Sequence, residues 1–197
     1  MERTQVLRAE GHAAAIRSVC PSDLAALSDF FEGLSVESRY LRFFAPVRPT
    51  DRLLRLLSGG PANVDAVVAV SGGVIVGHAM ASDQAEPADP SGARATDVGV
   101  VVADAWQRRG VGTALMRALI ARAQARGVTL LAMDVLPGNR RVVAMITGHW
   151  PDATIDYSPD GLDIRIQLPP YQPPGPRART RPWPATRQAR RLVTIGG

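Results

Sequence analysis

The sequence predicts a single α/β domain in which helices cover both faces of a mixed β-sheet. Two patterns carry this prediction: short β-branched runs typical of buried strands alternate with stretches whose apolar residues recur at helical spacing. The chain of 197 residues is long enough for one domain with a sizeable core. The elements follow in the order strand, two or three helices, three strands, helix, strand, helix and two strands, which a helix-covered sheet accommodates.

The first half of the chain combines a strand, a group of helices and a hairpin. Pro21 suits the first turn of a helix, where its missing amide hydrogen costs little, and Ser35 and Thr50 are suitable N-caps. Gly72 and Gly73 provide the tight turn between two β-rich runs. We expect strands at 13–19, 64–71 and 74–81, and helices at 21–34, 35–44 and 51–57.

The second half begins with a valine-rich run at 96–103, which predicts a strand. The stretch 110–126 has the apolar spacing of an amphipathic helix. A buried strand, a short helix and a hairpin across residues 159–161 follow. Their expected ranges are 128–135 for the strand, 139–147 for the helix, and 153–157 and 162–168 for the hairpin.

The chain divides into an N-terminal extension at 1–12, the α/β domain at 13–168 and a tail at 169–197. The tail is rich in proline, which disrupts helices and central strands, so we expect it to be disordered. It holds six of the 23 basic residues and none of the 18 acidic ones, which leaves 17 basic against 18 acidic residues elsewhere. Nucleic-acid binding is therefore not expected, except through this arginine-rich tail.

The composition argues against several other classes of protein. No apolar run reaches the ~18–20 residues that span a bilayer, and the polar N-terminus does not read as a secretory signal. Cys20 is the only cysteine, so no internal disulfide can form. His12, His78 and His149 lack metal-ligand spacing, so no metal site is expected. We expect a cytoplasmic protein with no membrane contact, either a monomer or a homodimer.

The most informative segment is the junction between the strand at 96–103 and the helix at 110–126. The first amides of a helix lack partners within it, and the helix dipole adds partial positive charge, so an anion can bind there. Glycines let a phosphate approach the backbone, while arginine and threonine side chains add charge and a donor. The residues concerned are Arg108, Arg109, Gly110, Gly112 and Thr113. We expect a pyrophosphate, although glycines here can also serve helix–sheet packing alone.

The run Gln107-Arg108-Arg109-Gly110-Val111-Gly112 resembles the Q/R-x-x-G-x-G/A signature of the GNAT N-acetyltransferases. The element order over 13–168 also resembles the GNAT fold. A second run, from Phe30 to Phe44, resembles the F-x-x-L-S-x-x-S-R-Y-x-R-F-F helix pair of bacterial protein-lysine acetyltransferase domains. The resemblance implies a mostly antiparallel mixed sheet of about six or seven strands, splayed between the fourth and fifth.

The resemblance also implies that acetyl-CoA is the cosubstrate and assigns residues to it. Val100, Val101 and Val102 would contact the pantetheine arm through their main chains, and the amide of Val102 would polarise the thioester carbonyl. Asn139, at the start of the helix after the fifth strand, matches an asparagine that often contacts pantetheine. The pyrophosphate would be held by Arg108, Arg109, Gly110, Val111, Gly112 and Thr113.

Acetylation of an amine needs a group that removes its proton, because a free lysine amine has a pKa of ~10.4. Asp97 lies ten residues before Gln107, where related lysine acetyltransferases often place a glutamate. It is the expected general base, and the alternative is a strand-end aspartate that caps a loop or pairs with an arginine. Many relatives also use a tyrosine as general acid, but Ile146 occupies that position here.

The acceptor is the least determined part of the prediction. Ser38, Arg39, Tyr40 and Arg42 either line the acceptor cleft or, as Tyr40 and its aromatic neighbours suggest, belong to the core. We expect a lysine side chain of a protein as acceptor. The alternatives are a small amine, such as an aminoglycoside, polyamine or amino acid, and a CoA-binding sensor or interaction module without turnover.

Overall fold

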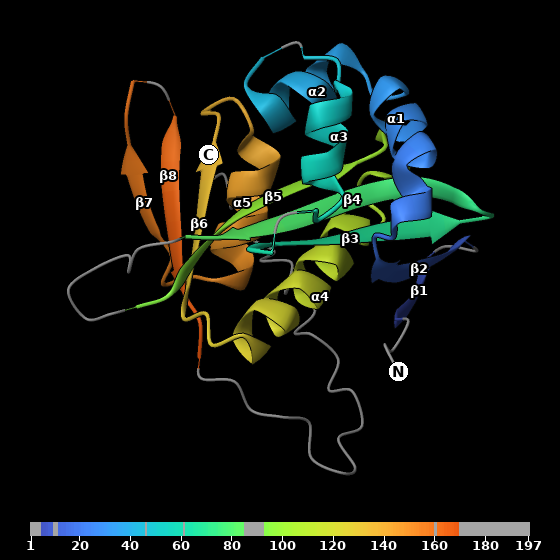
Figure 1. The fold of residues 1–197 in the computed structure, drawn as a ribbon. Coiled ribbons are helices and arrows are strands. Elements are labelled where there is room, and N and C mark those ends of the chain that lie inside the picture. Colours follow the sequence, from blue (N-terminus) through green and yellow to red (C-terminus); the bar gives the residue numbers. More distant parts are fainter. Residues whose placement is uncertain are drawn as a thin grey trace, which may run out of the picture.

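The computed structural model describes residues 5–9, 12–45, 47–60, 62–84, 93–159 and 161–169. They form one eight-stranded sheet with the order β1-β2-β3-β4-β5-β6-β8-β7, covered by helices (Figure 1). The strands are β1 Gln5–Ala9, β2 His12–Ser18, β3 Val64–Ser71, β4 Val74–Asp83, β5 Ala95–Val102, β6 Leu130–Val135, β7 Thr154–Tyr157 and β8 Leu162–Gln167. The helices are α1 Leu24–Glu32, α2 Val36–Phe43, α3 Asp51–Leu57, α4 Val111–Ala125 and α5 Arg140–His149, with 3₁₀ turns at Pro21–Asp23 and Asp104–Trp106.

The helices divide between the two faces of the sheet, as the sequence predicts. Helices α1 and α3 pack on one face against β3 and β4, around Phe31, Leu57 and Val68. Helix α4 lies on the opposite face (Figure 1), where Leu115 and Leu119 pack against β2, β3 and β4. A third cluster joins α4 and α5 to β6 and β8. Within the described ranges, no helix is long and apolar enough to cross a membrane.

The sheet is mixed and mostly antiparallel, and it opens between β5 and β6. These two strands are the parallel pair, and they share only the pairs Ala95–Leu130, Thr96–Leu131 and Asp97–Ala132. Strand β5 then continues to Val102 beside β4 but no longer beside β6. This divergence, which we call the β5–β6 gap, confirms the splayed sheet that the sequence predicts.

The sheet contains one strand more than the six or seven expected. Strand β1 lies in the stretch predicted to be an N-terminal extension and pairs with β2 in antiparallel register, from Gln5–Ile16 to Ala9–His12. Its five residues mix polar and apolar types without a distinct alternation, so the pattern alone does not mark a strand. The loop residue Asp160 and the tail from 170 onward lie outside the described residues.

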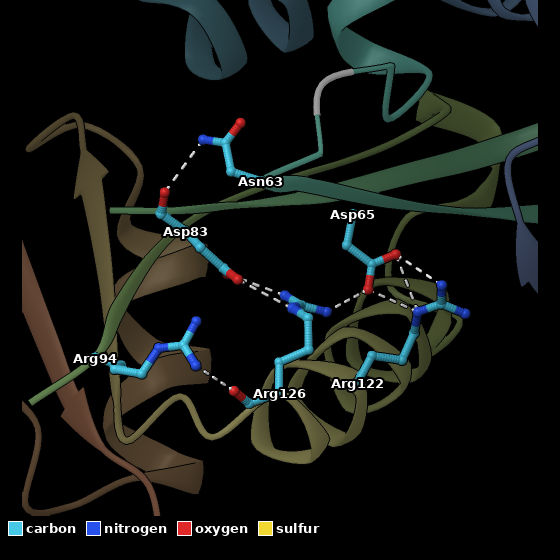
Figure 2. A network of polar contacts seen from close by, with 6 residues as sticks. All are labelled: Asn63, Asp65, Asp83, Arg94, Arg122 and Arg126. Carbon is cyan, nitrogen blue, oxygen red and sulfur yellow. Dashed lines mark hydrogen bonds and ion pairs between the residues drawn. The ribbon is translucent and has the colours of Figure 1, made fainter. Parts of the chain in front are cut away.

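A network of ion pairs fixes the C-terminal half of α4 to the sheet (Figure 2). Arg126 contacts Asp65 of β3 at 2.7 Å and Asp83 of β4 at 3.0 Å, and Arg122 contacts Asp65 at 2.8 Å. The Arg94 guanidinium donates to the Arg126 carbonyl at 2.8 Å. Burial raises the pKa of Asp83, but hydrogen bonds from Arg126 outweigh it and hold that pKa below its ordinary value. The network therefore links α4 to two central strands.

Replacing Arg126 by alanine should lower the free energy of unfolding by about 2 kcal/mol, because a hydrogen bond to a charged group is worth roughly 1.5–3 kcal/mol and solvent screens these partly exposed pairs. The matched control is Arg165→Ala, which removes an exposed ion pair with Asp163 and should cost at most about 1 kcal/mol. Urea titrations followed by circular dichroism measure both values. Equal losses in the two variants would contradict a stabilising role for the network.

Candidate active site

The start of α4 presents unpaired backbone donors, as the sequence predicts. The first intrahelical hydrogen bond runs from the Ala114 amide to the Gly110 carbonyl at 3.0 Å. No side chain caps the helix at Gly110, so the amides of the first turn remain directed outward. Gly110 has a φ of 78° and Arg108 a φ of 63°. These two left-handed residues bend the loop so that it leads directly into the helix.

A cavity of about 450 Å³ lies against this helix start. It extends from the first turn of α4 along β5 to α2 and α5, so it spans the β5–β6 gap. It brings together nine of the predicted site residues, namely Ser38, Val100, Val101, Val102, Arg108, Gly110, Gly112, Thr113 and Asn139. A Cβ at Gly112 would lie 3.6 Å from the Val102 side chain, which is an ordinary contact distance. Neighbouring atoms therefore leave the space beside Gly112 open.

The backbone of β5 alternates between its two sides. The Ala103 amide donates to the Val76 carbonyl of β4, and the Gln84 amide donates to the Ala95 carbonyl. Odd-numbered residues of β5 therefore direct their peptide groups toward β4. Even-numbered residues direct theirs to the opposite side, because successive peptides of a strand alternate.

The three valines predicted to contact a ligand consequently differ in role. Val100 and Val102 direct their main-chain groups into the β5–β6 gap, where no strand pairs with them. Val101 lines the cavity too, but it is paired with His78 and uses its main chain in the sheet. The Val102 carbonyl accepts a hydrogen bond from Gln107 at 3.2 Å, which leaves the amide of Val102 directed into the gap.

A hydrogen-bonded brace joins α2 to the end of β5. The Asp104 carboxylate accepts from the Ser35 amide at 3.0 Å, the Ser35 hydroxyl at 2.8 Å and the Ser38 hydroxyl at 2.7 Å. Gln107 donates to the Ser38 hydroxyl at 3.1 Å and to the Val102 carbonyl. Burial raises the pKa of Asp104, but hydrogen bonds from Ser35 and Ser38 leave it below its ordinary value. Ser38 is thus buried and structural, although it lines the cavity.

A second cavity of about 340 Å³, which we call the cleft, lies between α2, α3 and the β5–β6 gap. Most of its lining is apolar, and its charged residues are Arg42, Asp97 and Asp134. Asp97 is the last residue of β5 still paired with β6, and its carboxylate accepts a hydrogen bond from Gln84 at 3.1 Å. The cleft shares Leu41, Arg42, Val100, Asn139 and Val142 with the first cavity, so the two are neighbours.

Four other predicted residues lie away from the cavity walls or turn their side chains elsewhere. The Arg109 guanidinium lies 5.6 Å from the centre of the Trp106 ring, and the Val111 side chain is buried in the core. Arg39 donates to carbonyls at the end of α1, including that of Leu34 at 2.7 Å. The Tyr40 side chain is exposed on α2. Arg39 therefore stabilises the α1–α2 connection, and of Val111 only the backbone faces the helix start.

Three site residues were not identified as such from the sequence. Asp104 reads as a loop residue because its partners, Ser35 and Ser38, lie more than sixty positions away. Gln107 was only part of a motif. Asp134 lies in the strand that we expected to be buried, and a lone acid in an apolar strand is the signal that marks it. Within the described residues, no group of three histidine, cysteine or acidic side chains could hold a metal ion.

The fold and the site define an α/β domain in which a helix start with uncapped amides lies beside an opened sheet. The family model described as acetyltransferase (GNAT) family matches residues 31–147, which is more than half of the chain. The protein therefore belongs to the GNAT acetyltransferase family. A sequence comparison with curated proteins found no significant match.

Solved structures with the same fold include several acetyltransferases. The GNAT domain of PAT from Streptomyces lividans is 26% identical, with 85% of this chain and 97% of that chain covered and a TM-score of 0.72. YncA from Salmonella typhimurium, solved with acetyl-CoA, is 17% identical with coverages of 84% and 98% and a TM-score of 0.59. A phosphinothricin acetyltransferase from Sinorhizobium meliloti, in complex with acetyl-CoA, is 16% identical with coverages of 79% and 88% and a TM-score of 0.62.

Replacing Gly110 by alanine should weaken CoA binding about tenfold, because a non-glycine residue in the left-handed region costs about 1–2 kcal/mol and the loop would shift to relieve it. Titration calorimetry with CoA measures the change. The control is Gly148→Ala in α5, where an added Cβ meets no atom within 4 Å. Unchanged CoA affinity in a folded Gly110→Ala protein would contradict the role assigned to this turn.

Proposed function

We propose that this protein transfers the acetyl group of acetyl-CoA to a primary amine, with the lysine side chain of a protein as the acceptor. The observation that carries the proposal is that the cavity at the start of α4 and the cleft that contains Asp97 lie side by side along β5 and share five lining residues. A thioester held along β5 meets its acceptor beside a carboxylate. Family membership supports the same reaction class.

In this proposal the chain holds CoA at two places. The unpaired amides at the start of α4 and the guanidinium of Arg108 bind the pyrophosphate, since both supply positive charge to one wall of the cavity. The Val100 carbonyl and the Val102 amide bind the amides of the pantetheine arm, which takes the place of the missing neighbour strand. Asn139 has a side-chain oxygen that accepts from the Val142 amide, so it also caps α5 beside this path.

Asp97 is the general base of the proposed reaction. It accepts the proton of the acceptor ammonium, directly or through one water, and frees the nitrogen lone pair for attack on the thioester. Its position fits this role because it marks the point where β5 leaves β6, at the junction of the gap and the cleft. Gln84 holds one oxygen of the carboxylate and fixes its orientation.

The resemblance implies that the amide of Val102 donates to the thioester oxygen. The amide of Val100 is the better assignment. A strand rises about 3.3 Å per residue, so Val102 lies about 16 Å along β5 from Asp97, whereas Val100 lies about 10 Å away. A base that acts through at most one water needs the nearer donor. The amide of Val100 also faces the gap and can stabilise the charge that develops on the oxygen.

No side chain is assigned to protonate the departing thiolate. Ile146, at the position where many relatives have a tyrosine, is fully buried between α5 and the sheet. A thiol has a pKa near 8.5, so the thiolate is a good leaving group at neutral pH without assistance.

A cationic acceptor is favoured by the acids in and beside the cleft. Asp134 lies directly opposite Asp163 of β8, which lies opposite Asp156 of β7, so three carboxylates form a row that begins at the cleft, with Arg165 paired to the middle one. Such a row attracts an ammonium group. A protein acceptor is favoured by the likeness to the GNAT domain of the Streptomyces lividans protein acetyltransferase. Exposed Phe44 and Leu56 on the cleft wall offer apolar contacts to a polypeptide.

A small amine is the second candidate acceptor. The cleft volume of about 340 Å³, with two acids in its wall, is also sufficient for a compact amine or an amino acid. The two candidates differ in what lies beyond the reacting amine, because a small acceptor ends within the cleft and a protein extends past Phe44 and Leu56.

Replacing Asp97 by asparagine should lower kcat about 100-fold or more while acetyl-CoA binding stays unchanged, because general-base catalysis contributes roughly 10²–10⁴-fold. Thiol release measures turnover, and calorimetry measures binding. The matched control is Asp134→Asn, which should raise KM for a cationic acceptor and leave kcat within about threefold, since it removes attraction but no proton transfer. Full activity of Asp97→Asn would remove Asp97 from the mechanism.

A protein acceptor can be tested cleanly because the 197-residue chain contains no lysine, so side-chain self-acetylation cannot contribute background. Incubation with labelled acetyl-CoA and a lysine-bearing protein should label that protein, and a reductively methylated copy should remain unlabelled. Labelling of small amines alone would select the second candidate. Acetyl-CoA binding without turnover on any amine would support a CoA-binding module instead.

A further inference from the structure

Arg42 occupies a position between the two cavities. It lies in the last turn of α2, and its side chain forms part of the wall of both the first cavity, at the start of α4, and the cleft. It is therefore the one charged residue that the two cavities share among the residues described as lining them. Any group at the junction of the thioester and the acceptor amine comes near this side chain.

The guanidinium of Arg42 lies flat against the backbone of β5. A Cβ atom placed on Gly99 would fall 2.5 Å from the Arg42 Cζ and 2.9 Å from its Nη1, closer than real atoms approach. Only a glycine at position 99 leaves room for this arrangement. Gly99 lies between Asp97 and Val101 on the same face of the strand, so the guanidinium lies above the β5–β6 gap, close to the proposed site of acyl transfer.

Arg42 is half-buried, and among the described residues it lacks the partners that a cation removed from water normally has. Its Nε is buried and makes no hydrogen bond, and no described carboxylate forms an ion pair with it. Its one aromatic contact is the Phe43 ring, whose centre lies 5.1 Å from Cζ. A neutral ring compensates only a small part of the hydration that a buried guanidinium loses.

The pKa values of Arg42 and His78 are both lowered at this site. Burial lowers the pKa of Arg42 to about 10, so the guanidinium still carries its charge at neutral pH. His78, on the neighbouring strand, is fully buried, and burial lowers its pKa to about 4, with the charge of Arg42 acting in the same direction. The Leu57 carbonyl accepts from the imidazole at 2.7 Å. His78 is thus neutral at physiological pH and adds no second positive charge beside Arg42.

We propose that Arg42 binds a carboxylate carried by one of the two substrates. A guanidinium pairs with a carboxylate through parallel hydrogen bonds, and an ion pair in a water-poor site compensates a charge that the protein leaves unpaired. The inference rests on the proposed acyl transfer and deepens it, because it adds an anionic group to the chemical class of the substrate.

The carboxylate can enter from either side, since Arg42 faces both cavities. An acyl group with a terminal carboxylate, such as succinyl, would bring it from the CoA side. An acceptor such as an α-amino acid would bring it from the cleft, with its ammonium at Asp97 and Asp134. Pairs of ligands that differ only in this charge distinguish the two sources.

Equilibrium binding to the full-length protein tests the inference. The donor pair is succinyl-CoA and butyryl-CoA, titrated into free protein. The acceptor pair is leucine and leucinamide, titrated into protein saturated with CoA. The carboxylate-bearing member of one pair should bind at least about tenfold more tightly, and Arg42→Gln should abolish that preference while changing the affinity of the neutral member less than about threefold. Arg55→Gln, an exposed arginine of α3, is the matched control and should keep the preference.

Two results would overturn the inference: no preference within either pair, or a preference that Arg42→Gln retains. If Arg42→Gln does not fold, Gly99→Ala replaces it, because the added methyl group displaces the guanidinium without removing the charge. That variant should also lose the preference. A binding preference without turnover on any amine would contradict the proposed acyl transfer and leave the carboxylate site supported. Turnover on an amine without a binding preference would support the proposed acyl transfer and contradict the carboxylate site.

Discussion

Beyond Asp97, strands β5 and β6 no longer share hydrogen bonds, and the rest of the site depends on this single break in the ladder. Val100 and Val102 of β5 direct their peptide groups into the gap, where no described strand pairs with them, although Gln107 donates to the Val102 carbonyl. Such groups need water or an extended ligand. Beside this break lie both the cavity at the start of α4 and the cleft, and the two share part of their lining.

The brace around Asp104 explains how the gap keeps its width. A carboxylate that accepts from Ser35 and Ser38 ties α2 to the end of β5, and Gln107 links the same serine to the Val102 carbonyl. Helix α2 is thereby held over β5, and the loop into α4 cannot drift from the strand. The Asp104 carboxylate accepts from three donors, and these hydrogen bonds position residues that line the first cavity.

The sequence predicted those parts of the molecule whose causes are local. The glycine pair at 72–73, the valine run of β5 and the apolar spacing of α4 each imply their own structure, and the structure contains them. Arrangements that depend on distant residues were beyond such patterns. The contact of Arg42 with Gly99, the partners of Asp104 and the exposure of Asp134 each require knowing which strand lies beside which. Strand β1 was missed because its five residues acquire their conformation by pairing with β2.

The two ends of helix α4 differ in what they contact. Its first turn offers bare amides to a ligand, whereas its last turns are fastened to β3 and β4 by Arg122 and Arg126. One helix thus has separate residues for its uncapped first turn and for its attachment to the sheet. Sequence drift at the fastened end can tune thermal tolerance without touching the ligand, and changes in the opening loop can tune the ligand while the helix stays seated. The stability of the helix and the properties of its opening loop can thereby change nearly independently in evolution.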